Sequence, residues 1–276
     1  MMKTDDGTAY EIYAPDNAPE DHGSVDTLIL VHGLGLSMRT WDDFIPALRR
    51  RYQVVIYDLC GHGHSDLPQK TPSLSVLSDQ LDALLISLGI DRAHIIGFSL
   101  GGMINRRFAM DHREKVASLA ILNSPHERDA KSQKLVEQRA KDTSNGGAAA
   151  TIDVTLERWF TPSFRASHPA RVAWVRQTVL ANNPENYAAH RFVLANGVIE
   201  LIRPTPAITA PSLVITCARD SGSTPLMSEA ITNEIDGAEL VIIPDLQHLG
   251  LLEQPDLFLA PLLRFLDDLT RIPHER

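Results

Sequence analysis

A nucleophilic serine is the first chemistry that this sequence suggests, at the centre of Gly-Phe-Ser-Leu-Gly at 97–101. The segment follows the apolar run 93–96 and precedes a helix-like stretch at 101–110. A strand that turns directly into a helix strains its apex residue, and glycines two positions to either side let the backbones pass closely. The pattern predicts a nucleophilic hydroxyl on Ser99. The alternative is a glycine-rich turn whose serine only caps the helix that follows.

A serine hydroxyl needs a base to remove its proton and an acid to orient that base. In a site of this type the partners follow in the order serine, acid, histidine. His248, in the loop between a strand at 239–243 and the last helix, is the predicted base. Asp220, just beyond a strand at 212–217, is the predicted acid. Asp245 is the alternative acid, but its short spacing from the histidine better suits an aspartate that caps the loop.

Hydrolysis by such a serine also needs donors for the developing oxyanion, usually two backbone N–H groups. The amide of Leu100, at the start of the helix after the turn, is one predicted donor. The amide of Leu34 is the other, in the loop His-Gly-Leu-Gly at 32–35 that follows a strand at 27–31. Glycines in this loop let its backbone come close to the pocket, so that the Leu34 amide can point into it. We expect His32 to support the loop rather than to transfer protons.

A second histidine pattern, His-x-His-x-Asp at 62–66, could be taken for a set of metal ligands. A metal site would need further ligands at suitable positions. The pattern follows the apolar strand-like run 54–58, a position that suits a glycine-supported turn. The sequence therefore predicts no metal site at this pattern.

Strand-like runs alternate with amphipathic segments on either side of these motifs. The expected strands of the first half are 27–31, 54–57, 93–96 and 116–122, and the expected helices are 40–51, 75–88 and 101–110. Short runs that are apolar throughout are typical of parallel strands buried on both faces. The alternation predicts an α/β fold, a doubly wound and mostly parallel sheet with right-handed crossovers.

The alternation stops between 126 and 204. This stretch reads as several helices, with breaks at 145–147, 161–162, 168–169 and 183–184. The alternation resumes with strands at 212–217 and 239–243 and helices at 226–235 and 255–270. We predict an α/β core of residues 1–125 and 205–276 with a helical cap, 126–204, that covers a pocket at the strand ends. The cap has more basic than acidic residues. This excess is either a chance distribution of charge or an adaptation to anionic substrates.

Bulk composition limits the class of partner. The chain has 276 residues, a net charge of −9, 43% hydrophobic and 22% charged residues, which is ordinary for a globular protein with one sizeable core. The negative charge argues against nucleic acid or an anionic membrane as a main partner. No apolar run approaches the ~20 residues of a membrane span, and the start has no apolar signal core. We expect a cytoplasmic protein; the sequence leaves its oligomeric state open.

The two cysteines, Cys60 and Cys217, each end a strand-like run. In a chain without secretory features, two thiols are expected to be free rather than bridged. Cys60 has no basic neighbour in the sequence, so it is a poor alternative to Ser99 as the nucleophile.

Together these motifs resemble the α/β-hydrolase fold family over nearly the whole chain. They are 32–35, 61–66, 97–102, Asp220 with Thr224-Pro225, and His248. A narrower resemblance is to the 3-oxoadipate enol-lactonases, on 157–165, 186–189, 248–249 and 253–256. That resemblance implies hydrolysis of an enol-lactone in aromatic-compound breakdown without a cofactor. It also implies that Trp159 and Arg158 bind substrate, although the tryptophan could equally be cap core.

The sequence departs from those lactonases in three places. His32-Gly33 stands where Asn-Ser is expected, Cys217 stands where glycine is usual, and the loop 220–225 is one residue longer. The predicted function is therefore a serine hydrolase for a small ester or lactone, acting through an acyl-enzyme. Alternatives are a carbon–carbon bond hydrolase, a cofactor-free peroxidase-type enzyme, or a ligand receptor on the same fold.

Overall fold

An eight-stranded sheet forms the centre of the computed structural model, which describes residues 1–16 and 25–271. The strands are β1 (Met2–Lys3), β2 (Ala9–Tyr13), β3 (Thr27–Val31), β4 (Gln53–Tyr57), β5 (Ala93–Phe98), β6 (Val116–Leu122), β7 (Ser212–Cys217) and β8 (Glu239–Ile243). Their order is β1-β2-β4-β3-β5-β6-β7-β8. β3 to β8 pair in parallel, and β2 pairs antiparallel with β1 and β4. The predicted class, α/β with a doubly wound, mostly parallel sheet, is confirmed.

Burial explains why the sequence predicted the strands at the centre of the sheet. Every residue of β3, β5 and β7 is buried, so these strands are the continuous apolar runs expected at the centre of a parallel sheet. β1 is exposed and β2 is mostly half-buried, so neither gives such a run and neither was predicted. β4 and β5 lie on opposite sides of β3, and ligands bind where the strand order reverses in this way.

The helices that cover the sheet are α2 (Leu74–Leu88), α3 (Leu100–Asp111), α9 (Pro225–Asn233) and α11 (Pro255–Arg271), with the short α10 (Gly250–Glu253) before the last. Ser73 caps α2 by accepting a bond from the Val76 N–H, and Gly89 ends it in a left-handed conformation (φ 65°). Across the described residues, no helix combines the length and the apolar character needed to cross a membrane.

The helix expected at 40–51 is wrong. The chain instead forms a short 3₁₀ helix, η1 (Met38–Trp41), and one turn, α1 (Ile45–Leu48). Proline inside a helix removes a backbone hydrogen bond and clashes with the preceding turn, but it is tolerated in the first turn. Pro46 accordingly lies in the first turn of α1 and could not have continued a helix that began at residue 40.

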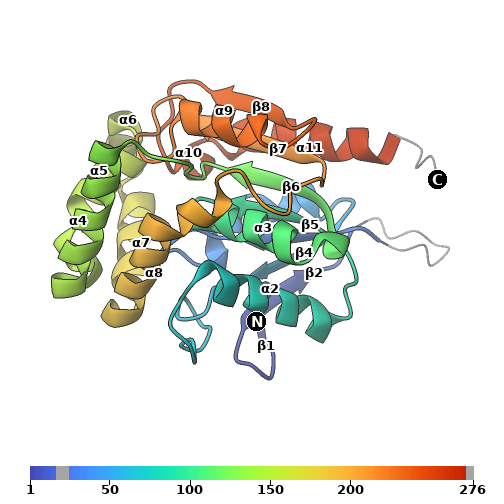
Figure 1. Cartoon of the computed structure of the whole chain (residues 1–276), viewed down its shortest axis with the longest axis horizontal. Coiled ribbons are helices and arrows are strands. Elements are labelled where there is room, and N and C mark those ends of the chain that lie inside the picture. Colours follow the sequence, from blue (N-terminus) through green and yellow to red (C-terminus); the bar gives the residue numbers. More distant parts are fainter. Residues whose placement is uncertain (17–24, 272–276) are drawn as a thin grey trace.

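Five helices lie between β6 and β7, where the cap was expected. They are α4 (Ala130–Gly146), α5 (Ile152–Trp159), α6 (Pro162–Ser167), α7 (Pro169–Leu180) and α8 (Pro184–Asn196), followed by the 3₁₀ turn η4 (Gly197–Leu201). The predicted breaks are confirmed: Gly147 ends α4, and α6, α7 and α8 each begin with a proline. These inserted helices gather at the left end of the molecule in Figure 1. That they form a separate cap domain stays a prediction.

Candidate active site

Ser99 lies at the turn between β5 and α3 in a strained backbone conformation, φ 56° and ψ −111°. The glycines around it are required by close backbone contacts. A Cβ at position 97 would lie 2.2 Å from the carbonyl oxygen of Gly101, and a Cβ at position 101 would lie 2.2 Å from that of Val31. The Ser99 side chain makes no capping hydrogen bond to α3, which removes the capping alternative.

The Ser99 hydroxyl lies against the ring of His248. The distance from Ser99 Oγ to His248 Nε2 is 3.1 Å, and His248 Nδ1 lies 2.6 Å from Asp220 Oδ2. All three side chains are buried, and they follow β5, β7 and β8 in the sheet. The carboxyl ends of these parallel strands share one edge, so residues far apart in the sequence meet there. This geometry allows a proton to pass from the hydroxyl to an imidazole that a carboxylate orients.

Asp220 is held as a carboxylate. Burial raises the pKa of Asp220. The His248 ring, the Asn123 side-chain amide and the Ser223 backbone N–H together lower it by more than burial raises it, so the pKa of Asp220 lies below its usual value. Asp220 Oδ1 accepts bonds from the N–H groups of Gly222 (2.8 Å) and Ser223 (2.9 Å). Each oxygen therefore has donors, and the charge is available to stabilise a protonated His248.

Asn123 is a site residue that sequence reasoning missed. It directly follows β6, and its side-chain amide donates to Asp220 Oδ2 at 2.9 Å. Its backbone is left-handed (φ 45°), a conformation that asparagine tolerates better than most residues. A polar residue immediately after a buried strand at the carboxyl edge was the available signal.

Asp245, the alternative acid, lies in solvent. Its side chain is 79% exposed and pairs with Arg219 at 2.7 Å, whereas Asp220 contacts the His248 ring. The structure therefore brings Asp220 and not Asp245 to His248.

The two predicted oxyanion donors are in suitable surroundings. Leu100 is the first residue of α3, so its N–H has no acceptor within the helix. Leu34 lines the same cavity as Ser99. Within residues 1–16 and 25–271, neither of these two amide N–H groups donates a hydrogen bond. Both are thus free for a ligand, and their role as donors stays a prediction.

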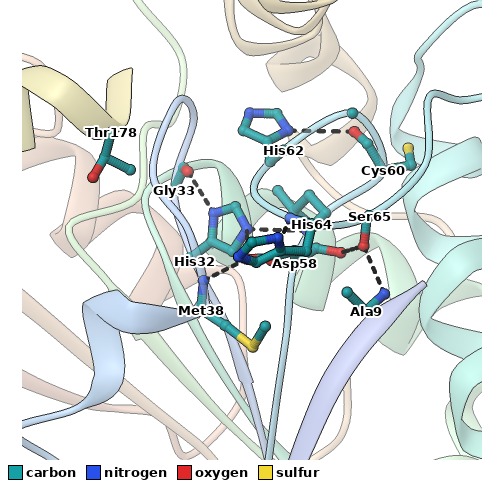
Figure 2. A network of polar contacts seen from close by, with 12 residues as sticks. Ala9, His32, Gly33, Met38, Asp58, Cys60, His62, His64, Ser65 and Thr178 are labelled. Carbon is teal, nitrogen blue, oxygen red and sulfur yellow. Dashed lines mark hydrogen bonds and ion pairs between the residues drawn. The ribbon is translucent and has the colours of Figure 1, made fainter. Parts of the chain in front are cut away.

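His32 holds the loop that carries Leu34, and Figure 2 shows its ring beside Gly33 of that loop. His32 Nδ1 lies 2.8 Å from the Gly33 carbonyl oxygen, and Nε2 accepts a bond from the Leu59 N–H at 3.0 Å. Burial lowers the pKa of the His32 ring, which keeps it neutral. Both ring nitrogens lie within hydrogen-bond distance of backbone groups, so His32 supports the loop.

The His-x-His-x-Asp pattern does not converge on a point. The buried His62 ring packs against those of His32 and His190, with centroids 5.4 and 4.8 Å apart. Asp66 pairs with Lys3, and the exposed His64 uses only its backbone N–H to reach Asp58. In the part of the chain that the structure describes, no three His, Cys, Asp or Glu side chains are grouped as metal ligands.

Both cysteines are free, as expected, and neither is activated. Burial raises the pKa of Cys60 to about 11 and that of Cys217 to about 12. At neutral pH each is a thiol, and the thiolate is the reactive form.

A cavity of about 160 Å³ opens above Ser99 and His248. Trp159 and Arg158, the residues expected to bind substrate, both line it. The Trp159 ring lies 6.0 Å from the His248 ring and is 6% exposed, so it packs against the core and faces the cavity. Three further arginines, which sequence reasoning did not single out, line the same cavity: Arg128, Arg139 and Arg191.

With this fold and site, the chain belongs to the alpha/beta hydrolase fold family, whose model matches residues 26–255. Its relatives are hydrolases of differing specificity. It is 27% identical over 251 residues to 3-oxoadipate enol-lactonase 1 of Acinetobacter baylyi, covering 90% of this chain and 89% of the relative. It is 24% identical over 239 residues to (E)-2-((N-methylformamido)methylene)succinate hydrolase of the same organism, covering 86% and 88%.

Among solved structures, the chain is similar to the enol-lactonase from Burkholderia xenovorans LB400. The TM-score is 0.84 at 27% sequence identity, over 94% of this chain and 96% of that one. Family membership and a general hydrolase chemistry follow from these likenesses. Sequence identities of 24–27% do not specify the substrate.

Proposed function

We propose that this protein is a serine hydrolase that cleaves a small carboxylic ester or lactone through an acyl-enzyme on Ser99. The observation that carries the proposal is the placement of His248 between the Ser99 hydroxyl and the Asp220 carboxylate, at 3.1 and 2.6 Å. A hydroxyl, an imidazole and a carboxylate in that order are the arrangement that activates a serine.

In the first half-reaction, His248 Nε2 takes the Ser99 proton as Oγ attacks the substrate carbonyl. Charge develops on the carbonyl oxygen, and the N–H groups of Leu34 and Leu100 would stabilise it. The Asp220 carboxylate stabilises the protonated ring. His248 then gives its proton to the leaving oxygen, which in a lactone stays tethered to the acyl group.

In the second half-reaction, His248 removes a proton from water, and the resulting hydroxide attacks the acyl carbonyl. The tetrahedral intermediate collapses, and His248 returns the proton to Ser99. Phe98 and Trp159 pack near the His248 ring, with centroids 5.0 and 6.0 Å away, and keep the ring oriented through both steps.

An enol-lactone is the proposed substrate type, because the relatives include 3-oxoadipate enol-lactonases and the cavity is small. Participation in aromatic-compound breakdown is part of the same proposal. Carbon–carbon bond hydrolysis, peroxidase-type chemistry and a receptor role are the alternatives, and profiling enol-lactones against diketones, peroxide and short esters separates them.

The direct test is Ser99→Ala. We expect hydrolysis of p-nitrophenyl acetate and of an enol-lactone to fall by roughly 10⁴-fold or more, since a triad nucleophile is removed. The unfolding transition should stay where it is in the wild type. The matched control is Ser144→Ala, an exposed serine on α4 whose hydroxyl donates a hydrogen bond to the Ala140 carbonyl oxygen in its own helix. Wild-type turnover by Ser99→Ala would overturn the proposal.

A further inference from the structure

The cavity above Ser99 is strongly basic in an acidic protein. Among the described residues, four arginines line it and no aspartate or glutamate does, although the chain has 35 acidic residues and a net charge of −9. The four come from the inserted segment: Arg128 precedes α4, Arg139 is on α4, Arg158 is on α5 and Arg191 is on α8. They form the wall that faces the serine, and we call them the arginine wall.

These charges are not neutralised by the protein. Of the described carboxylates, none forms an ion pair with any arginine of this wall, whereas Arg171 and Arg176, elsewhere on the inserted helices, pair with Asp43 and Asp153. Within the described part of the chain, the hydrogen bonds of Arg128 go to uncharged oxygens, those of Gln133, Leu194 and Ala195.

Two members of the wall are also partly withdrawn from solvent. Arg191 is 7% exposed, and the Arg158 Nε is buried without a hydrogen-bond partner in the described part of the chain. Asp220 influences Arg158, but its oxygens already accept from His248, Asn123, Gly222 and Ser223.

The electrostatics show that three members of the wall interact. Burial, with smaller contributions from Arg139 and Arg191, lowers the pKa of Arg158 to about 10. Burial and Arg191 likewise lower the pKa of Arg139. Arg128 lies apart from this trio: its pKa is lowered to about 10 by burial alone. Like charges that are partly desolvated destabilise the folded protein until an anion binds between them.

We infer that the substrate of this site carries two carboxylate groups besides the bond that is cleaved. One would bind among Arg139, Arg158 and Arg191, and the other would bind Arg128. The planar guanidinium matches a carboxylate with two parallel hydrogen bonds, so arginine suits this role better than lysine. One carboxylate would leave most of the wall's charge uncompensated. This inference rests on the proposed function and specifies its substrate class as a small dianionic ester or lactone.

Binding can be tested without turnover, in the Ser99→Ala variant. Isothermal titration with dimethyl glutarate, monomethyl glutarate and glutarate varies the number of carboxylates from none to two on one carbon skeleton. We expect the affinity to rise about tenfold or more with each carboxylate, which is about 1.4 kcal/mol per step, and to weaken as salt is added.

The arginine wall itself is tested by Arg139→Met in the Ser99→Ala background, because Arg139 is half-exposed and its replacement is the least disruptive. Glutarate affinity should fall about tenfold. Arg139→Lys, which keeps the charge, should restore part of it. Arg176→Met removes an arginine that pairs outside the cavity and should bind glutarate as Ser99→Ala does.

The outcomes separate the two proposals. Equal affinity for the three glutarate compounds, or unchanged glutarate binding by Arg139→Met, overturns the dianion inference whatever Ser99 does. Turnover by Ser99→Ala overturns the proposed function and leaves the titration series standing. Inorganic phosphate is the competing anion, and tighter binding of phosphate than of glutarate would overturn the assignment to carboxylates.

Discussion

Two buried histidine–aspartate pairs lie at the same edge of the sheet, and of these two only Asp220–His248 faces a serine hydroxyl. Asp220 and His248 follow β7 and β8, and their contacting atoms are 2.6 Å apart. Asp58 and His32 follow β4 and β3, and their nearest oxygen and nitrogen are 3.9 Å apart. Both pairs are inaccessible to bulk solvent or nearly so. Residue type, burial and position at the edge are therefore shared.

The pairs differ in what the second ring nitrogen faces. His248 Nε2 faces the Ser99 hydroxyl, a group that can lose a proton, whereas His32 Nε2 accepts from the Leu59 backbone N–H, which cannot. The Asp58 oxygens accept from the backbone N–H groups of Met38 and His64, at 2.7 and 2.8 Å, as Figure 2 shows for Met38. The first pair can move a proton, and the second ties loops together.

The largest effect that distinguishes the pairs is expected from Asp220→Asn. The amide cannot stabilise a protonated His248 and favours the wrong tautomer, so kcat should fall about 10⁴-fold. Asp245→Asn is the matched control, because that carboxylate is exposed and contacts Arg219 instead; its kcat should stay within about twofold. Steady-state kinetics on p-nitrophenyl acetate measure both. Equal losses in the two variants would contradict the assignment of the acid.

Asp58→Asn should lower the stability of the protein more than its kcat, the opposite of Asp220→Asn. An asparagine has one acceptor oxygen for the two N–H groups of Met38 and His64, so one buried donor loses its acceptor. We expect the free energy of unfolding to fall by about 2 kcal/mol. kcat should fall only about tenfold, because the loop that carries Leu34 shifts while the proton path stays intact. Urea unfolding and kinetics on the same sample test this balance. A kcat loss as large as that of Asp220→Asn, with normal stability, would make Asp58 a catalytic group.

The smallest effect concerns pH. Burial lowers the pKa values of His32, His62 and His190, whose unfolded value is near 6.5. Below that pH the unfolded chain binds protons that the folded chain does not, so stability falls as pH falls. His62 alone should account for about 1 kcal/mol of unfolding free energy between about pH 7.5 and 5.5.

His62→Phe should reduce this pH dependence, measured by urea unfolding at each pH. His64→Gln, in the same loop but exposed, is the control and should keep the wild-type slope. An unchanged slope in His62→Phe would show that the buried rings are not the source of the pH dependence.

Much of the fold was predictable because its signals are local. Buried parallel strands are short apolar runs, and the prolines and Gly147 mark where the inserted helices break. The error at 40–51 came from treating the apolar spacing as helical across Pro46, where the backbone cannot continue a helix. β1 and β2 were not predicted because β1 is an exposed edge strand of two residues and β2, although paired on both sides, is mostly half-buried, so neither is a run that is apolar throughout.

The serine, histidine and aspartate of the site were predictable for the same reason. Ser99, His248 and Asp220 each directly follow or lie close beyond a strand, and parallel strands place their carboxyl ends at one edge. The arginine wall gave no such signal. Its members lie on separate segments with no shared periodicity, so only the packing of α4, α5 and α8 brings them to one cavity.

Local conformation could be read from the chain alone: the strained turn at Ser99, the short apolar runs of the parallel strands, and the order in which a serine, an aspartate and a histidine follow those strands. Backbone sterics and hydrophobic period act over a few residues and can be read along the chain. The tertiary structure alone decided that Asp220 and not Asp245 reaches His248, that His32 faces backbone groups, and that four arginines meet over the serine. Hydrogen bonds and charge interactions depend on distance through space, which the spacing along a chain does not specify.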